Sequence, residues 1–257
     1  MESRRKVFSF TGKIGKFEYF KCMKIYSSMR NSLFTVLLSA FFFWSCSPLK
    51  QYPKESYAWA APEIENFVAQ DSTEDYPENS LLFVGSSSIR LWNTLAEDMA
   101  PYPVIQRGYG GAHLRDAIFY TDKLLGKHQP TMIIGFIAND IKGVAEDESP
   151  RKVARLFRFF LKQLRQTHPN IPFLWVEITP TKSRWKQWPE IKTVNEKIKD
   201  FCAKTPNLHF VETAEAFLTK EGLPRTELFV ADQLHLNPQG YALWSSLIKK
   251  EIEQHLN

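Results

Sequence analysis

The sequence has little cysteine, and that little is unevenly placed. Of its three cysteines, Cys22 and Cys46 lie near the N-terminus and only Cys202 lies in the rest of the chain. No disulfide can therefore form within that larger part, which excludes the class of small domains held together by disulfides. The remaining chain is long enough to bury a full hydrophobic core without such cross-links.

An excess of basic charge is missing too, once the N-terminal part is set apart. The formal net charge of the whole chain is +5. Residues 1–45 hold eight of the 33 basic residues but only two of the 28 acidic ones, so 25 basic and 26 acidic residues remain from residue 46 onward, a net charge of −1. Nucleic-acid-binding domains carry a strong positive charge, so we expect no nucleic-acid partner.

Long apolar runs, metal-ligand spacings and phosphate-binding loops are absent as well. The apolar stretch 33–44 has 12 residues, whereas a membrane-spanning helix needs about 20. The six histidines are scattered, with no His-x-x-x-His pair. The run 108–113 has His113 where a dinucleotide-binding fingerprint has its third glycine, and no Gly-Lys phosphate motif occurs. We therefore expect no metal and no cofactor.

The N-terminal part has the features of an export signal. A basic start at Met29-Arg30 precedes the apolar stretch, which ends in Ser45 and Cys46. This order resembles a bacterial lipoprotein signal, in which the cysteine is acylated and becomes the new N-terminus. We expect a leader over 1–46, a tether over 47–60 and a domain over 61–257, lipid-anchored at Cys46 in the membrane of the bacterial cell envelope. An uncleaved anchor and simple secretion remain as alternatives.

The domain alternates short apolar runs with helical stretches. Most of the runs are continuously apolar, which favours parallel strands covered on both faces. Ser149-Pro150 and Asn237-Pro238 are typical helix starts, and a further helix is predicted over 189–203. The pattern predicts a three-layer α/β/α sandwich with a five-stranded parallel sheet. The predicted strands are Leu81–Gly85, Val104–Gly108, Thr131–Ile137, Pro172–Thr179 and Leu208–Glu212.

Candidate chemical groups follow these strands, where active sites of such folds gather. Ser87 follows the first strand and enters a helix, which suits a nucleophile whose own N–H points into the site. Gly110 and Gly111 follow the second strand and can free backbone N–H groups for an anion. Asn139 follows the third strand, where its side chain could donate to an oxyanion. Each segment alone would more often be a turn or a helix cap.

The loop before the last helix supplies the remaining groups. Asp232 and His235 lie three residues apart, so both can sit on one turn. The carboxylate can then hold the imidazole in the tautomer that a general base needs. An Asp/His pair by itself is more often a surface turn, but here it joins three other segments placed after strands.

Together these segments resemble the SGNH hydrolases, the GDSL-type esterases and lipases. That family is named for Ser, Gly, Asn and His in four separated blocks, matched here by Ser87, Gly111, Asn139 and His235. The most specific part is Asp232-x-x-His235-Leu236-Asn237-Pro238-x-Gly240-Tyr241. The match spans roughly 60–257 and implies the family's flavodoxin-like fold. One departure is Ser86, which replaces the aspartate of the family's Gly-Asp-Ser.

The resemblance implies a role for each matched residue. Ser87 would be the nucleophile, because Gly85 and Trp92 set the register, and His235 and Asp232 would complete a catalytic triad. The N–H groups of Ser87 and Gly111 and the side chain of Asn139 would form the oxyanion hole, with Gly110 as the alternative to Gly111.

The substrate is less constrained by the sequence. The loop 180–189 holds Arg184, Trp185 and Trp188, which could bind a sugar ring or an acyl group, or simply pack the loop. The resemblance implies a carboxylic ester hydrolase for short acyl esters, with acetylated carbohydrate as the expected target. Two alternatives remain: an O-acyltransferase with the same triad, and a non-catalytic carbohydrate-binding lipoprotein.

Overall fold

The computed structural model describes residues 47–256, so the predicted leader and Cys46 lie outside the described residues. The described chain forms a five-stranded parallel sheet in the order β2-β1-β3-β4-β5. This confirms the predicted sheet, and three of the strands end within three residues of a candidate group. The strands are β1 (Leu81–Gly85), β2 (Val104–Gly108), β3 (Met132–Phe136), β4 (Phe173–Val176) and β5 (Leu208–Val211).

Burial along the strands follows their place in the sheet. Every residue of the three central strands β1, β3 and β4 is buried. The edge strands β2 and β5 each carry two residues that are only partly buried. Continuous apolar runs in the centre are what a sheet covered on both faces requires.

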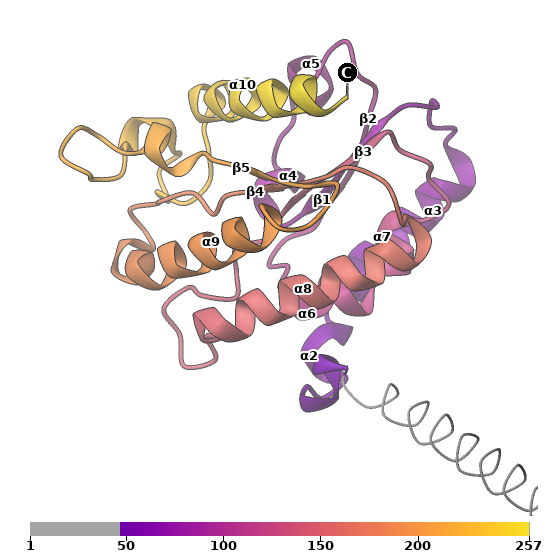
Figure 1. Cartoon of the computed structure of the whole chain (residues 1–257), viewed down its shortest axis with the longest axis horizontal. Coiled ribbons are helices and arrows are strands. Elements are labelled where there is room, and N and C mark those ends of the chain that lie inside the picture. Colours follow the sequence, from indigo (N-terminus) through magenta and orange to yellow (C-terminus); the bar gives the residue numbers. More distant parts are fainter. Residues whose placement is uncertain (1–46, 257) are drawn as a thin grey trace, which may run out of the picture. The chain divides into compact units, whose positions relative to one another are not determined.

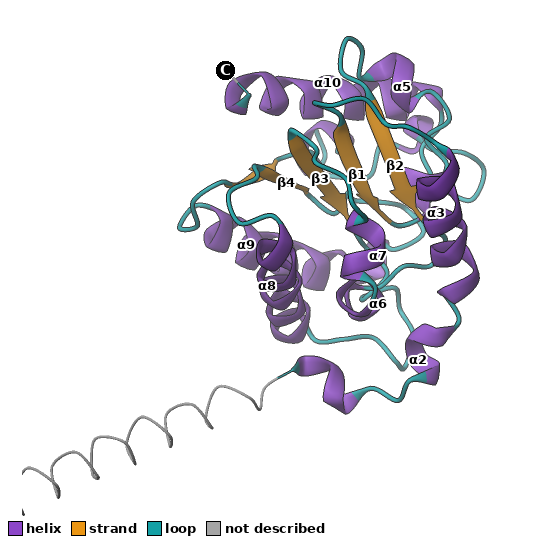
Figure 2. Cartoon of the chain, turned by 90° about the vertical axis from the view of Figure 1, so that its right-hand side faces the viewer, coloured by secondary structure: helices purple, strands orange, loops and turns teal. Residues whose placement is uncertain are grey.

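Helices cover both faces of the sheet, which confirms the three-layer sandwich. Figures 1 and 2 show α6, α7, α8 and α9 on one face and α5 and α10 on the other. The longer helices are α3 (Ala61–Thr73), α8 (Pro150–Thr167), α9 (Trp188–Cys202) and α10 (Pro238–His255). The shorter ones are α2 (Glu55–Ala58), α4 (Ser87–Arg90), α5 (Leu95–Asp98), α6 (Leu114–Phe119) and α7 (Thr121–Leu125), with 3₁₀ turns η1 (Pro48–Gln51), η2 (Trp185–Gln187), η3 (Ala214–Phe217) and η4 (Thr226–Leu228).

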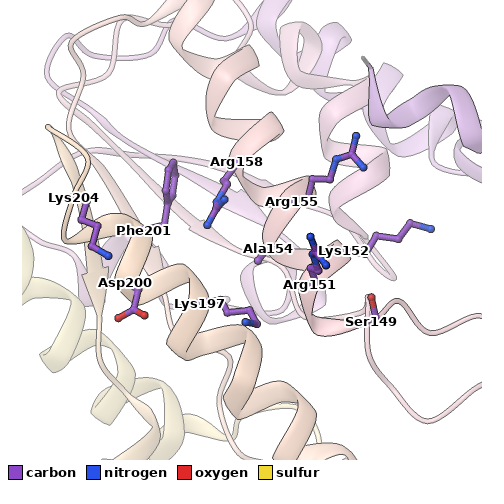
Figure 3. A pocket seen from close by; sticks show the side chains of 10 residues that line it. All are labelled: Ser149, Arg151, Lys152, Ala154, Arg155, Arg158, Lys197, Asp200, Phe201 and Lys204. Carbon is purple, nitrogen blue, oxygen red and sulfur yellow. The ribbon is translucent and has the colours of Figure 1, made fainter. Parts of the chain in front are cut away.

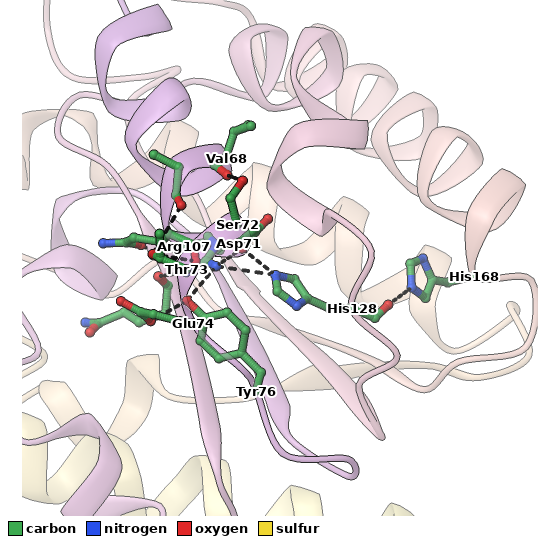
Figure 4. Close-up of polar contacts among 12 residues, drawn as sticks. Val68, Asp71, Ser72, Thr73, Glu74, Tyr76, Arg107, His128 and His168 are labelled. Carbon is green, nitrogen blue, oxygen red and sulfur yellow. Dashed lines mark hydrogen bonds and ion pairs between the residues drawn. The ribbon is translucent and has the colours of Figure 1, made fainter.

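A buried polar cluster fastens α3 to the edge strand β2 (Figure 4). The side chain of Arg107 is only 2% exposed, and its guanidinium pairs with the Asp71 carboxylate. His128 Nε2 lies 3.0 Å from the same carboxylate, and the Tyr76 hydroxyl lies 3.0 Å from the guanidinium. A buried charge needs such partners, so this cluster holds α3 in place.

The segment predicted as a tether is folded instead. Residues 48–60 form η1 and α2, and they bury Tyr57 and Ala60. The Tyr57 ring stacks on Phe119 at 4.1 Å, which explains why this short polar stretch is ordered against α6. The compact unit therefore begins at Pro48 rather than at residue 61. Within residues 47–256, no helix is long and apolar enough to cross a membrane.

Candidate active site

The turn after β1 places Ser87 at the start of α4. The Ser86 N–H donates to the Phe136 carbonyl at 3.0 Å, which ties the turn to β3. A Cβ atom on Gly85 would lie only 2.3 Å from that same oxygen, so only glycine fits at the end of β1. The close strand–turn contact therefore depends on Gly85 and delivers the half-buried Ser87 to the carboxyl edge of the sheet.

An aromatic cluster beneath the turn fixes α4 from the other side. Trp92 is fully buried and stacks on Tyr241 of α10 at 5.2 Å. The Tyr241 hydroxyl donates to the Ser88 carbonyl at 2.8 Å. Trp244, one turn further along α10, packs edge-on against Phe136 at 4.9 Å. The tryptophan that sets the motif register is thus a packing anchor for the turn.

Ser87, His235 and Asp232 form one continuous chain of hydrogen bonds. Ser87 Oγ lies 2.8 Å from His235 Nε2, and His235 Nδ1 lies 2.6 Å from Asp232 Oδ2. The other carboxylate oxygen of Asp232 accepts the backbone N–H groups of Leu234 at 2.9 Å and His235 at 3.0 Å. This arrangement suits a general base held in one orientation by a carboxylate.

The carboxylate of Asp232 is kept ionised by its own loop. Partial burial acts to raise the pKa of Asp232, but the hydrogen bonds from the His235 backbone and ring and from the Leu234 N–H outweigh it. The pKa of Asp232 therefore lies below its ordinary value. The loop is in turn fixed by the start of α10, where the Asn237 side chain accepts the Gly240 N–H at 3.0 Å. That bond is the helix cap which the sequence predicted.

The loop after β2 and the block after β3 meet beside Ser87. Asn139 Nδ2 donates to the Ala112 carbonyl at 2.9 Å, which leaves its second N–H for another acceptor. Gly111 has a φ of +73°, a left-handed conformation that favours glycine. Among the hydrogen bonds within residues 47–256, none uses the backbone N–H of Ser87 or Gly111. Gly110 lies next to the Arg90 guanidinium.

Arg184 contacts the protein rather than open solvent. Its two terminal nitrogens donate to the Ala138 carbonyl at 2.5 Å and to Asn139 Oδ1 at 2.7 Å. Burial lowers the pKa of Arg184, although a guanidinium remains charged at neutral pH. Because Asn139 Oδ1 accepts from Arg184, the Nδ2 group must face the other way. Arg184 therefore fixes the orientation of the Asn139 amide.

Ser86 does not replace the missing aspartate with a hydrogen bond. It is buried, and its side chain makes no hydrogen bond within the part of the chain that the structure describes. Its carbonyl accepts the N–H groups of Ile89 at 3.0 Å and Arg90 at 3.1 Å. The nucleophile turn is thus held by backbone bonds and packing.

A small cavity lies between Ser87 and the core. Its volume is about 30 Å³, enough for roughly two water-sized groups. Ser87, Asn139 and Arg184 line its polar side. The apolar side is lined by Phe136, Ile178, Phe229, Leu234, Leu236 and Trp244.

The two tryptophans predicted to bind substrate lie apart from this cavity. The rings of Trp185 and Trp188 stack on one another at 6.0 Å, and Trp188 lines a separate hollow beside Lys192. Their role in substrate binding stays a prediction. Trp59, which the sequence placed in a tether, lies instead against Gly111 and is 44% exposed. The sequence signal for this placement is a single tryptophan within the polar stretch 47–60.

Several solved structures share this fold at low sequence identity. A provisionally assigned acylhydrolase of Bacteroides fragilis matches with a TM-score of 0.64 and 17% identity over 75% of this chain and 97% of that one. A GDSL-like lipase of Bacteroides thetaiotaomicron gives 0.62 and 16% over 74% and 97%. A carbohydrate esterase family 3 protein of Talaromyces cellulolyticus gives 0.52 and 14% over 69% and 97%. No curated protein matches the chain.

The family assignment rests on the sequence itself. The model of the GDSL-like lipase/acylhydrolase family matches residues 73–243, about two thirds of the chain. The matched span includes Ser87, Gly111, Asn139, Asp232 and His235, and the fold around it is that of the similar structures. The chain therefore belongs to the GDSL-like lipase/acylhydrolase family.

Proposed function

We propose that the chain is a serine esterase that hydrolyses short acyl esters, and acetyl esters of carbohydrate in particular. The observation that carries this proposal is the hydrogen-bonded chain from Ser87 through His235 to Asp232. Nucleophile, base and orienting carboxylate are all within hydrogen-bond distance, as acyl transfer through a serine requires.

The reaction follows from the order of these contacts. Ser87 Oγ attacks the ester carbonyl while His235 Nε2 takes its proton, giving a tetrahedral oxyanion. Its collapse breaks the ester C–O bond, and His235 returns the proton to the departing alcohol. Water then attacks the acyl-enzyme with His235 again as base, which releases the carboxylic acid and regenerates Ser87. Asp232 holds the imidazole throughout and stabilises the imidazolium.

The oxyanion is held by three N–H donors in this proposal. They are the backbone N–H groups of Ser87 and Gly111 and the free N–H of the Asn139 amide. Replacing Asn139 with alanine should lower kcat by about 10²–10³-fold, because one oxyanion donor is lost. KM should change little, since this donor acts mainly on charge that develops in the transition state. An unchanged kcat in Asn139→Ala would remove Asn139 from the oxyanion hole.

The small cavity supports a short acyl group. About 30 Å³ beside Ser87 is room for a group as small as an acetyl methyl. Trp244 and Phe136 close its inner end and are packed against each other.

The exposed ring of Trp59 supports a carbohydrate as the group that carries the ester. It lies beside Gly111, next to the proposed oxyanion hole, and offers an apolar face of the kind on which sugar rings stack. Two proteins of similar fold, at 14% identity, bear the names carbohydrate esterase family 3 and acetyl esterase. These names concern those proteins, and for this chain they suggest which substrates to try first.

The test is hydrolysis of p-nitrophenyl acetate, butyrate and octanoate by residues 47–257, beside Ser87→Ala and His235→Ala. We expect acetate to be turned over fastest, octanoate slowest, and both variants to be inactive with unchanged thermal unfolding. Ser88→Ala is the matched control, because its hydroxyl lies one position out of register, and it should retain activity. Acetate release from acetylated xylan or peptidoglycan fragments then tests the natural substrate.

Two results would overturn the proposed esterase. Equal turnover by wild type and Ser87→Ala would exclude the serine mechanism. Quantitative transfer of acetyl from the ester to an added sugar, with no free acetate, would indicate an O-acyltransferase instead.

We also propose that the protein is exported and lipid-anchored at Cys46. The support is the basic, apolar and small-residue order that ends at Cys46. Mass spectrometry of the N-terminal peptide from the membrane fraction should find an acylated Cys46, and Cys46→Ser should release the protein from membranes. A membrane-bound Cys46→Ser protein with its leader intact would support the uncleaved anchor.

A further inference from the structure

The outer face of α8 carries a cluster of positive charge that the net charge of the domain does not reveal. Between Pro150 and Thr167 the helix has six basic residues and no acidic one. Its other face is buried in the core through Val153, Phe157 and Leu164. The basic side chains therefore project from one side of the helix, although the whole domain is nearly neutral.

A groove of about 1060 Å³ runs between this face and α9 (Figure 3). Ala154 and Phe201 supply apolar surface within it, and Asp200 is the one acidic residue among the described residues that line it. Six cations line the same groove, so its net charge is strongly positive. They are Arg151, Lys152, Arg155, Arg158, Lys197 and Lys204.

Most of these cations are available to a ligand. Lys152 pairs with Glu148 at 2.8 Å, and the Arg158 guanidinium lies over the Phe201 ring at 4.9 Å. Within residues 47–256 the other four, Arg151, Arg155, Lys197 and Lys204, are exposed and form no ion pair. Clustered, exposed and unpaired cations repel one another and favour the binding of anions.

The folded domain begins beside this groove. The Tyr52 hydroxyl, just after η1, donates to Glu148 at 2.6 Å, and Lys152 lies over the Tyr52 ring at 4.9 Å. Lys152 thus contacts both the first turn of the domain and the groove. Only Ser47 separates Pro48 from Cys46. Chain geometry therefore limits the Cα atom of Pro48 to about 7 Å from the Cα atom of the residue that would carry the acyl anchor.

We propose that this basic groove, the surface lined by Arg151, Arg155, Arg158, Lys197 and Lys204, binds the anionic phospholipid headgroups of a membrane. Arginine side chains match phosphate oxygens in pairs, and each cation adds attraction to an anionic bilayer surface. The groove lies where the chain would leave the lipid anchor, which favours a membrane over a soluble polyanion. That the groove faces the membrane rests on the proposed lipid anchor, whereas the groove's binding to headgroups needs only the domain.

The test uses the domain without its anchor, residues 47–257. Every member of the core that the described residues form lies between Tyr57 and Ile252, so this fragment contains the whole of that core. It is sedimented with vesicles of phosphatidylcholine alone and with vesicles that also contain phosphatidylglycerol. The groove variant carries Arg151→Gln, Arg155→Gln and Arg158→Gln. The control carries the same number of neutralised exposed lysines elsewhere, Lys192→Gln, Lys220→Gln and Lys250→Gln.

We expect binding to the anionic vesicles only, weakened roughly 100-fold in the groove variant and little in the control. Raising the salt from about 0.1 M to about 1 M should abolish binding, because the Debye length falls from about 10 Å to about 3 Å. Hydrolysis of p-nitrophenyl acetate should be equal in all three proteins, which shows that they are folded and separates this result from the esterase proposal.

Three outcomes would overturn the proposal. They are equal binding to both kinds of vesicle, equal loss in the two variants, and retention by the anionic vesicles that is far weaker than binding to a soluble polyanion such as dextran sulfate. The last result would assign the groove to an anionic polymer.

Discussion

Among the Asp–His pairs within residues 47–256, two show how one kind of contact can serve opposite uses. His235 and Asp232 lie 2.6 Å apart in the active-site loop, with side chains 23% and 48% exposed. His128 and Asp71 lie 3.0 Å apart beneath α3, with side chains 8% and 18% exposed. Each pair joins one imidazole to one carboxylate, so the pair alone does not decide what it does.

The third partner decides the role. At the active site the free imidazole nitrogen faces the Ser87 hydroxyl, which can lose its proton to it. In the buried pair, His128 Nε2 contacts Asp71 and also lies 3.3 Å from the Arg107 guanidinium. The guanidinium has no proton to transfer at neutral pH and repels a positive imidazole. Burial, with the Arg107 charge, lowers the pKa of His128, while Asp71 opposes the shift. The first pair can move a proton and the second holds a helix.

Exchanging each carboxylate for its amide gives the largest contrast between the two pairs. Asp232→Asn should lower kcat by about 10⁴-fold, because the amide favours the wrong imidazole tautomer. Asp71→Asn should leave kcat unchanged and lower the free energy of unfolding by about 3 kcal/mol, because Arg107 loses its counter-charge. Steady-state kinetics and urea unfolding of both variants check this. A large kcat loss in Asp71→Asn would mean that the two regions are coupled.

Removing the third partner of the buried pair should lower the free energy of unfolding by at least as much as Asp71→Asn, without the loss of kcat expected for Asp232→Asn. We expect Arg107→Met to lose about 3–5 kcal/mol of unfolding free energy, since Asp71 is left without its cation. Arg155→Met is the matched control on an exposed surface and should change stability by less than about 0.5 kcal/mol. Urea unfolding measures both. A near-neutral Arg107→Met would show that packing, not the ion pair, holds α3.

Arg184 tests how far positioning matters at the active site. Arg184→Met removes the donor that orients Asn139, so we expect kcat to fall about tenfold, the equivalent of one charge-assisted hydrogen bond. KM should stay constant, because both terminal nitrogens already bind the protein. Lys182→Met, on the same loop, is the control. A rise in KM at constant kcat would instead support the prediction that Arg184 contacts the substrate directly.

The smallest expected effect concerns pH. The pKa of His128 is lower in the folded protein than its ordinary value of about 6.5, so its neutral form favours folding. This contribution is complete above pH 6.5 and is lost as the pH falls towards the folded pKa. His128→Gln should therefore lose less stability than wild type on acidification through that window. Burial raises the pKa of Asp140 to about 6, so Asp140 titrates in the same window. It does so in both proteins, and its contribution cancels when the unfolding free energies of wild type and His128→Gln are subtracted. Urea unfolding at several pH values measures this, and identical pH profiles of stability for wild type and His128→Gln would contradict the lowered pKa of His128.

Local patterns predict much of the fold here. The buried runs of β1, β3 and β4 are continuous in apolar residues, and the Asn237-Pro238 start of α10 is a cap that needs only neighbouring residues. Ser87, Asp232 and His235 could be proposed because their spacing belongs to a known family. The hydrogen bonds that join them are tertiary, and only the structure supplies them.

What the sequence did not predict depends on contacts between distant segments. The role of Arg184 follows from its reach to Asn139, 45 residues earlier in the chain. The polar and proline residues of 47–60 predict a tether that includes Trp59, but Tyr57 anchors this segment on Phe119. The basic groove was hidden because a sum of charges ignores which side of α8 they occupy.

The folded N-terminal segment makes the family boundary a poor place to cut this protein. The match to the family model begins at residue 73, after α2 and nearly all of α3. A fragment starting there would leave the Arg107 guanidinium buried without Asp71, and it would strip the Trp59 ring from Gly111. Such a fragment would have an unpaired cation on its edge strand β2 and an exposed Gly111 loop beside its nucleophile. For expression, grafting or domain exchange, the compact unit to keep whole starts at Pro48.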